Sequence, residues 1–393
     1  MYFPHTVKDS HGPTGILPGY QHTDELSSYD ADVATETELG LSVPAGTVAL
    51  INHDSWHRQT WNSGDERRIM CKFHYERVEE PSPAAGAPSP PADWGTDAVH
   101  PRLRNEPMWR STWRWMHGAE QPPAQQGEGK AAEAAGLLAA VEVAGRNATT
   151  EGMRAAFSLA ETEADSPTVI PALVRLLEQI AQEMQPDLDG WEPYTFPTIG
   201  GFHLPPAAQA LMAMGAAAVK PVVEACLEGE ALRSCWARHV LGCEILGGMG
   251  AAAFAALGQA EAATRAAVTR GLLAGTEHAE WFVRRSALEA LGRLRLGGGD
   301  VLSALAARAG DPDFLVRRAA VIAGAAMLPT ERAPFHAVVA SLARVLEEEP
   351  DPFTRSYAAF ALHRTAEGGG GDDGGARHAL AAHWRSAAWA AAL

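Results

Sequence analysis

The sequence is poor in cysteine, in basic residues and in long apolar runs, and each shortage excludes a class of protein. Only four cysteines occur in 393 residues, without a CxxC pair or a disulfide-like spacing, so we expect a reducing, cytoplasmic location. Acidic residues outnumber Lys and Arg by 48 to 32, which gives a formal net charge of -16. Because binding to phosphates needs clustered Lys and Arg, we expect no nucleic-acid partner.

Patterns that direct a chain into or through a membrane are also lacking. The opening MYFPHTVKDSHGPTG has no basic n-region and no apolar h-region, so we expect no signal peptide. A spanning helix needs about eighteen consecutive apolar residues, and charges interrupt every Ala-rich stretch before that length. We therefore expect no membrane partner.

Three of the cysteines, Cys226, Cys235 and Cys243, lie close together in the sequence. Their spacings of nine and eight residues fit no standard zinc pattern. We expect them to be small buried side chains rather than metal ligands.

Composition divides the chain into three parts, as expected for a length that exceeds one hydrophobic core. Residues 1–80 carry β-branched and aromatic residues with Gly and Pro, which predicts short antiparallel strands. Residues 81–128 are a Pro-rich linker, and residues 129–393 use the Ala, Leu, Arg and Glu vocabulary of helices.

Residues 1–80 contain four segments that read as strands: MYFPHTV, TGILP, GTVALINH and RRIMCKFHYERV. Since side chains alternate along a strand, Ile69, Cys71, Phe73 and Tyr75 share one face of the last segment. That face is apolar, so we expect another element to cover it.

The linker contains a segment with helical spacing. Trp109, Trp113 and Met116 recur at the period of a helix, with Trp115 beside them. We expect a short amphipathic helix that docks onto a domain face, because indoles bury a large area, although a Trp stripe can also grip a ligand.

The helical part contains an internal repeat. Residues 279–294, 312–327 and 351–366 share an aromatic residue, an Arg-bearing position and a stripe of small apolar residues, and a second helix lies between each pair. Two-helix units at a period of roughly 33 to 47 residues predict a HEAT-type solenoid. The small residues let neighbouring helices approach to about 8 Å.

Arginines follow the turn that opens two of these helices. They either join the repeats through carboxylates such as Asp311, Asp313 and Asp351, or they form a binding ridge. The four arginines are Arg284, Arg285, Arg317 and Arg318.

Two stretches of the first part, YFPHTVKDSHGPTGILPGYQH and PAGTVALINHDSWHRQTWNSGDERRIMCKF, carry the family resemblance. They resemble the phytanoyl-CoA dioxygenase family of Fe(II)/2-oxoglutarate oxygenases, and more closely the branch in which these motifs precede HEAT repeats. The resemblance implies an α+β chain, with a partial double-stranded β-helix (jelly roll) followed by an α-solenoid of HEAT-type repeats.

The resemblance also implies site residues. His57 matches the distal histidine of a two-His-one-carboxylate iron site, which leaves three iron positions for 2-oxoglutarate and O₂. Arg68 matches the arginine that holds the far carboxylate of 2-oxoglutarate, with Arg67 as second choice. Asn62 and Thr60 match positions that shape the turn between them, and Asn62 is the second cofactor-binding candidate.

The first two iron ligands are not evident. The family places a His-x-Asp upstream of its GPT motif, and only eleven residues precede Gly12. We expect the chain to lack these ligands, and a lone imidazole holds Fe(II) weakly. Three substitutes fit less well, namely His22 with Asp24, His5 with Asp9, and His53 with His57.

Two functions therefore compete. The first is an Fe(II)/2-oxoglutarate-dependent hydroxylase acting on a small or acyl-type substrate, with the solenoid recruiting a protein partner. The alternative is a non-catalytic HEAT-repeat scaffold or adaptor carrying an oxygenase remnant. A repeat-type lyase or chromophore-binding protein ranks third. Because a jelly roll needs about eight strands and four or five are present, the sheet should expose edges that need cover.

Overall fold

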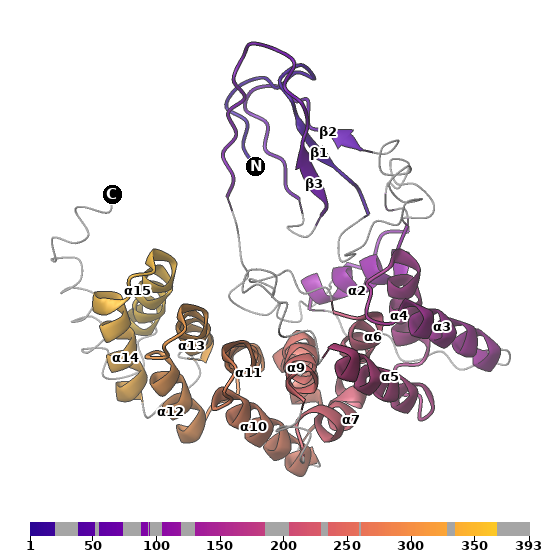
Figure 1. The fold of residues 1–393 in the computed structure, drawn as a ribbon, viewed down its shortest axis with the longest axis vertical. Coiled ribbons are helices and arrows are strands. Elements are labelled where there is room, and N and C mark those ends of the chain that lie inside the picture. The colour runs from indigo at the N-terminus through magenta and orange to yellow at the C-terminus, as the bar shows by residue number, and fades with distance from the viewer. Residues whose placement is uncertain are drawn as a thin grey trace. The chain divides into compact units, whose positions relative to one another are not determined.

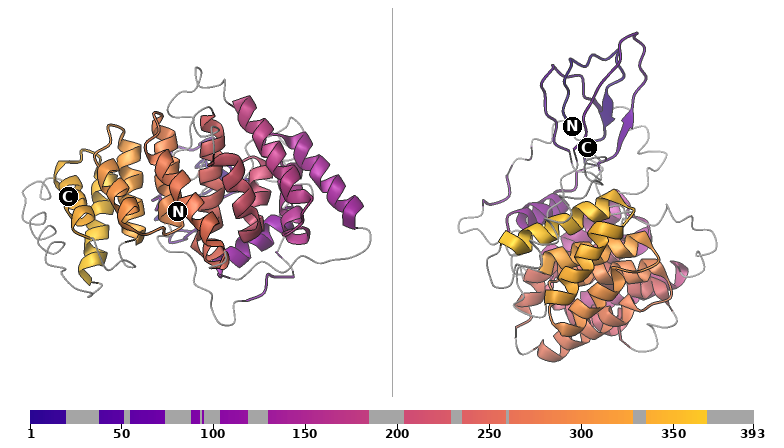
Figure 2. Two further views of the ribbon diagram at one scale, coloured as in Figure 1. Left: turned by 90° about the horizontal axis from the view of Figure 1, so that it is seen from below. Right: turned by 90° about the vertical axis from the view of Figure 1, so that its left-hand side faces the viewer.

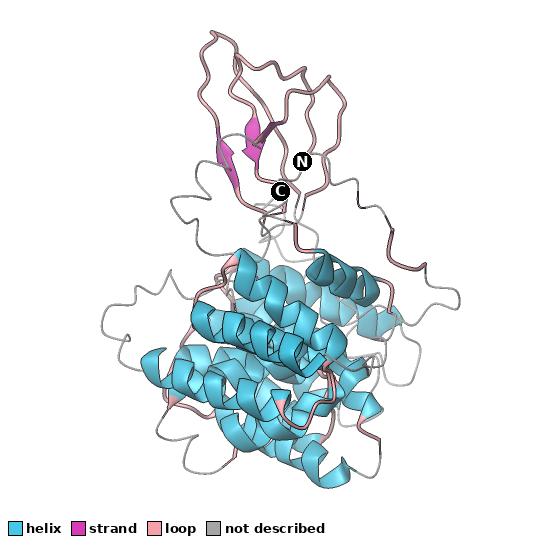
Figure 3. Ribbon diagram, turned by 90° about the vertical axis from the view of Figure 1, so that its right-hand side faces the viewer, coloured by secondary structure: helices cyan, strands magenta, loops and turns pink. Residues whose placement is uncertain are grey.

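The computed structural model describes residues 1–19, 38–51, 55–73, 88–92, 94, 104–118, 130–184, 204–228, 235–258, 261–327 and 335–367. Over these residues the chain is mostly helical, with short strands only near its beginning (Figure 3). The chain divides into two compact units, residues 1–169 with 189–213 and residues 170–188 with 214–393. The boundaries predicted from composition, 80 and 128, stay a prediction.

The β-rich part of the first unit contains a three-stranded antiparallel sheet (Figure 1). Its strands are β1 (Thr14–Ile16), β2 (Leu39–Gly40) and β3 (His57–Gln59), in the order β2-β1-β3. Gly15 of β1 lies opposite Gly40 on one side and Arg58 on the other. The described residues therefore give a small sheet, and no jelly roll is seen in them.

Two of the predicted strands contribute less than expected. The segments GTVALINH and RRIMCKF supply only isolated bridges, from Val48 and Cys71 to Tyr2 between them. Proline explains the short ladders, because Pro lacks the N–H that a ladder needs. Pro4 follows the Tyr2 bridge closely, and Pro13 and Pro18 bracket β1.

Gly15 leaves space for a cross-strand ion pair. An added Cβ would lie 1.6 Å from Oε1 of Glu38. The Glu38 carboxylate passes over the central strand to accept hydrogen bonds from Nε and Nη2 of Arg58, at 2.9 and 2.8 Å. A side chain at residue 15 would therefore make the flexible end of Glu38 move from this position.

The helices of the first unit are α2 (Glu106–Met116), α3 (Lys130–Ala144), α4 (Thr150–Thr162) and α6 (Pro206–Met214). The predicted Trp-bearing helix is confirmed as α2, which begins after Asn105, whose side chain accepts the N–H of Met108 at 3.3 Å. Met108 is buried with Met153 and Phe157 of α4. The face covered by α2 is therefore that of α4.

Ion pairs hold α2 on α4 as well. Arg110 and Arg114 both donate to the carboxylate of Glu161, at 2.8 and 3.0 Å. Trp109 and Trp113 each pack edge-on against Trp94, with ring centroids 6.0 and 5.9 Å apart. The Trp stripe therefore serves packing.

The second unit is a stack of helix pairs. In Figures 1 and 2, α9, α11, α13 and α15 form one row and α7, α10, α12 and α14 another. This stack of helices fits the predicted α-solenoid. Its helices are α5 (Val169–Met184), α7 (Ala216–Cys226), α9 (Trp236–Ala256), α10 (Ala262–Thr276), α11 (Trp281–Arg293), α12 (Gly299–Arg308), α13 (Phe314–Met327), α14 (Phe335–Glu348) and α15 (Pro352–Glu367).

Small residues bring the helices of the first row together, as their spacing predicted. A Cβ on Gly247 of α9 would lie 3.2 Å from Cα of Ala290 in α11. A Cβ on Gly292 of α11 would lie only 2.7 Å from Cα of Ala323 in α13. Gly292 therefore permits a backbone approach that any side chain would block.

Helix α9 is long and apolar enough to cross a membrane, and it is one such helix in the described part of the chain. Of its most apolar stretch, 61% is buried inside the protein. Its backbone also leaves helical geometry at Gly250, where φ is 76° and ψ is 174°. Burial of this extent is equally the property of a solenoid core helix.

Candidate functional site

His57, the predicted iron ligand, lies on the edge strand β3 opposite Ile16. Its side chain is exposed, and its Nδ1 lies 2.8 Å from the carbonyl oxygen of Ser55. Nδ1 is therefore engaged by the backbone.

Arg68, the predicted 2-oxoglutarate ligand, donates from Nη1 to Oγ1 of Thr14 at 2.8 Å. Thr14 and Ile16 alternate onto the same face of β1, and directly opposite residues in an antiparallel pair share a face. Arg68 therefore contacts the sheet on the face that carries His57. This placement does not test the role of either residue.

Asn62 shapes a turn. Its Oδ1 accepts the N–H of Gly64 at 2.9 Å, and its Nδ2 donates to the carbonyl of Glu66 at 3.0 Å. Thr60 closes the same region by donating from Oγ1 to the carbonyl of Pro13 at 2.6 Å. Both ends of the Asn62 amide thus bind backbone groups, so its assignment to a cofactor rests on the resemblance alone.

The described residues do not fit an iron triad. They contain no group of three His, Cys, Asp or Glu side chains arranged to hold a metal ion. Of the substitute ligands, His5 is exposed and Asp9 accepts a hydrogen bond from Ser42. The other substitutes, His22, Asp24 and His53, lie outside the described residues.

A buried histidine that the motifs did not single out lies in this region. His11 is buried, and its Nε2 lies 3.0 Å from Oε2 of Glu66. The sequence signal was weak, because His11 stands in the turn segment KDSHGP, where polar residues are ordinary.

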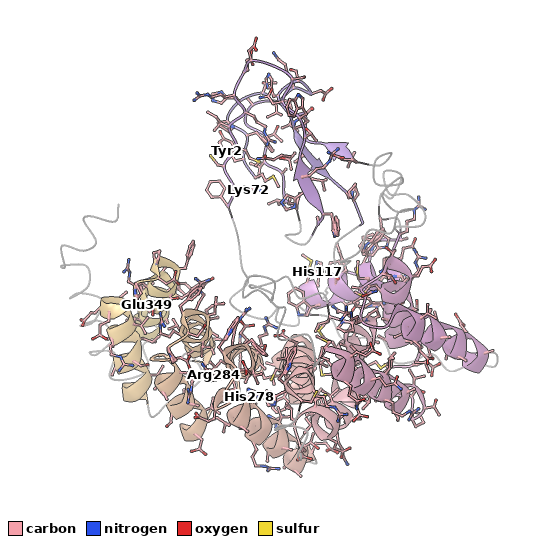
Figure 4. The ribbon with its side chains drawn as sticks, in the orientation of Figure 1. Tyr2, Lys72, His117, His278, Arg284 and Glu349 are labelled. Carbon is pink, nitrogen blue, oxygen red and sulfur yellow. The ribbon has the colours of Figure 1, made fainter. Side chains whose placement is uncertain are left out.

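One face of the β-rich part is exposed and apolar. Tyr2, which is labelled in Figure 4, bridges Val48 and Cys71, so these three side chains share a face, and Ile69 and Phe73 follow by alternation. Val48, Ile69 and Phe73 are 63%, 50% and 58% exposed. The sequence predicted an apolar face here that needs cover, and no described residue covers it.

A repeated pair joins successive helices in the second unit, and we call it the inter-repeat ladder. In each pair, the fourth residue of one helix contacts a residue in the turn before the next helix of the same row. That second residue stands three positions before the helix begins. Arg284 of α11 donates from Nε and Nη2 to the two oxygens of Asp311, at 2.9 and 2.8 Å. Arg317 of α13 binds both oxygens of Glu349 in the same way.

These contacts support the inter-repeat role of the arginines. Burial opposes the charge of Asp311, but the hydrogen bonds from Arg284 and Arg308 outweigh it and lower the pKa of its carboxyl. Arg318 pairs with Asp351 at 2.8 Å, as predicted. Arg285 instead pairs with Glu289 of its own helix, at 2.7 Å.

The first junction of the ladder is built from two histidines. His239, the fourth residue of α9, stacks on His278, which precedes α11 by three residues, with ring centroids 6.5 Å apart. His239 is fully buried, and neither ring nitrogen has a hydrogen-bond partner. Burial lowers the pKa of His239 to about 4, helped by His278. Sequence reasoning missed this pair, although aligning the fourth helix residues would have shown it.

An aromatic edge runs along the starts of α13 and α15. The Arg318 guanidinium lies 5.5 Å from the ring centroid of Phe314 and 5.6 Å from that of Phe353. Phe314 and Phe353 are 46% and 67% exposed. We call Phe314, Arg318 and Phe353 the aromatic edge.

A pocket of about 440 Å³ lies between the end of α9, the start of α10 and the loop after α11. Arg265 and Arg295 contribute to its lining, and the Arg265 guanidinium covers the ring of Phe254 at 4.3 Å. This pocket is remote in sequence from the residues that the oxygenase resemblance singled out.

The cysteines behave as expected. Cys226, Cys235 and Cys243 are buried, and burial raises the pKa of Cys226 to about 12. A thiol in this state is a small apolar side chain.

Comparison with known proteins supports the repeats. The family model for HEAT repeats matches residues 269–363, from within α10 to within α15. No curated protein matches the chain. Residues 269–363 are therefore similar to HEAT repeats, which commonly bind other proteins, and the match does not extend to the β-rich part.

Proposed function

We propose that the protein is a scaffold or adaptor whose HEAT-type solenoid binds another protein. The observation that carries this proposal is the aromatic edge. Phe314 and Phe353 are large, exposed side chains on a rigid array, with Arg318 held between them.

Side chains of this kind dominate protein interfaces. Aromatic residues and Arg are enriched at binding hot spots, and a rigid helix end loses little conformational entropy when it is covered. The edge lies within the segment similar to HEAT repeats. The exposed apolar face around Tyr2 is a further surface of the kind that marks protein interaction.

Affinity capture with the full chain tests the proposal. The wild-type protein and the variant Phe314→Ser/Phe353→Ser are compared on extract of the source cells. Val143→Ser is the matched control, because Val143 is exposed on α3 of the other unit. We expect a protein retained by the wild type and the control and lost by the double variant. Identical retained proteins for all three would contradict the proposal.

A second candidate function is Fe(II)/2-oxoglutarate-dependent hydroxylation. It is favoured by the placement of His57 and Arg68 toward one sheet face, and it needs further iron ligands beyond the described residues. Titration with Fe(II) and 2-oxoglutarate without oxygen tests it. A metal-to-ligand absorption band lost in His57→Ala supports this function, and a folded protein without the band contradicts it.

A further inference from the structure

Helix α15, the last helix that the structure describes, carries an arginine in the pose of those in α11 and α13. Arg284, Arg317 and Arg355 are each the fourth residue of their helix. Each donates from Nη1 to the carbonyl six residues earlier, at 2.9, 3.0 and 2.8 Å. The guanidinium is thus fixed by the backbone before it meets a carboxylate.

In the first two cases the other edge of the guanidinium holds a carboxylate from one kind of turn. The turns are Asp311-Pro312-Asp313 and Glu349-Pro350-Asp351, each placed just before a helix. The first acid binds the arginine and also accepts the N–H of the second, at 3.0 and 3.1 Å. We call this an acid-Pro-Asp turn.

The second Asp of the turn begins the helix. Asp313 accepts the N–H of Leu315, and Asp351 accepts that of Thr354, both at 2.9 Å. The turn therefore presents a carboxylate to the preceding repeat and an N-cap to its own helix, and the proline fixes the distance between them.

Arg355 has the same pose, and no carboxylate of the described residues meets it. Within the part of the chain that the structure describes, its one hydrogen bond is to the carbonyl of Glu349. In Arg284 and Arg317 the edge formed by Nε and Nη2 binds Asp311 and Glu349. In Arg355 this edge binds no acid of the described residues. The exposed Phe353 lies two residues away on the same helix.

We propose that the α15 end of the solenoid is a docking site for another protein that carries an acid-Pro-Asp turn at the start of a helix. Arg355 holds the first acid by a two-point hydrogen bond, and Phe353 packs against the apolar residue that follows the turn. This proposal rests on the proposed function and names its partner class.

Two observations favour a different protein over a second copy of this chain. The acid-Pro-Asp sequence occurs twice in the 393 residues, at 311–313 and 349–351. In both places the first acid is already bound by an arginine of the preceding repeat. The folded chain therefore has no such turn to offer to its copy.

Peptide binding to the full chain tests the site. The probe is a labelled peptide that copies residues 309–323, which include the turn at 311–313, and the control peptide carries Asp311→Asn. Fluorescence anisotropy should show the acid peptide binding at least about tenfold more tightly than the amide peptide, because the neutral amide has no negative charge and only one acceptor oxygen for the guanidinium.

Variants locate the effect. Arg355→Met should reduce the affinity for the acid peptide to that for the amide peptide, and Arg355→Lys should keep part of it, because Lys is a point charge without the planar fork. Arg270→Met is the matched control, since Arg270 is an exposed arginine of the same unit. An unchanged unfolding midpoint in Arg355→Lys shows that the fold is intact.

Four results would overturn the proposal. Three are equal affinity for the two peptides, no effect of Arg355→Met, and an equal effect of Arg270→Met. The fourth is a gain of about tenfold in the affinity for the acid peptide in Asp372→Asn/Asp373→Asn, because the chain's own acids would then occupy Arg355 in place of a partner. Extract capture that depends on the aromatic edge while the peptides fail would leave the proposed function standing alone.

Discussion

The first and second junctions of the inter-repeat ladder fill the same position with different interactions, a neutral histidine stack in the first and an ion pair in the second. Between α9 and α11 the ladder position holds His239 and His278, with no hydrogen bond at the His239 ring. Between α11 and α13 it holds Arg284 and Asp311, with two hydrogen bonds. A solenoid thus tolerates a neutral stack or a charged pair at one position, provided that the charge state suits burial.

The largest difference between the junctions should follow from removing one partner. In Arg284→Ala, Asp311 keeps its ion pair with Arg308 and the hydrogen bond from the N–H of Asp313, although its side chain is 0% exposed. Leaving a buried charge short of its partner costs about 3–5 kcal/mol. We expect a loss of about that size in the free energy of unfolding, measured with urea. Arg270→Ala, which removes an exposed pair, is the control, and similar losses in both variants would contradict the prediction.

Acid should weaken the histidine junction first. The pKa of His239 falls from 6.5 to about 4 on folding, so the unfolded chain binds the proton more readily. The neutral His239 ring makes its full contribution to the free energy of unfolding above pH 6.5. As the pH falls toward 4 this contribution is lost, and the total loss is about 3 kcal/mol. Urea unfolding at pH 7 and pH 5 should show a little over half of this loss. His239→Leu should remove that pH dependence, and an unchanged pH dependence would refute the assignment.

The carboxylate junctions should respond at lower pH. The pKa values of Asp311 and Glu349 are held below their usual 3.8 and 4.5, Asp311 by Arg284 and Arg308 against the effect of burial, and Glu349 by Arg317. Groups of this kind stabilise the folded state above their unfolded pKa, and the effect is lost as the pH falls through the lowered value. In His239→Leu we expect a smaller fall in stability from pH 7 to 5, because the pKa of His278 is also lowered by burial, and a larger fall below about pH 4. A fall below pH 4 that is no larger than the fall between pH 7 and 5 would contradict this order.

The smallest expected difference concerns helix spacing. Gly292→Ala would place a Cβ 2.7 Å from backbone of α13, whereas Gly247→Ala would place one 3.2 Å from backbone of α11. Overpacking of this kind costs about 1–3 kcal/mol, so we expect about 2 kcal/mol for the first and less than about 1 kcal/mol for the second. Thermal or urea unfolding of both variants compares them, and an equal effect would show that the second junction adjusts as easily as the first.

The helices were predictable because their signal is local. The second helices at 299–308 and 335–348 lie between the repeated segments, as predicted, since apolar period, turn residues and helix formers agree there. The strands were less predictable. Alternation suggested long strands near Val48 and Cys71. In the structure each of these residues forms a single bridge to Tyr2, because prolines near Tyr2 interrupt the ladder.

The residues of the candidate sites were also predictable only in part. The sequence identified the arginines of the repeats and predicted their pairing across repeats, but it did not identify Glu349 as the partner of Arg317 or His278 as the partner of His239. Those partners lie 32 and 39 residues away, and only the stacking of helices sets them side by side. For His57, Asn62 and Arg68 the motif supplied the roles, and the iron, the 2-oxoglutarate and the cytoplasmic location stay predictions.

By itself the sequence determined a chain of helix pairs with a β-rich beginning, because periodicity, proline and glycine act over a few neighbouring residues. Only the tertiary structure decided which groups meet between repeats. The Arg284 guanidinium forms an ion pair because the next repeat places Asp311 against it, and the His239 imidazole stays neutral because it is buried and the next repeat places His278 against it. The tertiary structure likewise decided that Arg355 ends the ladder with its hydrogen-bonding edge unmatched among the described residues.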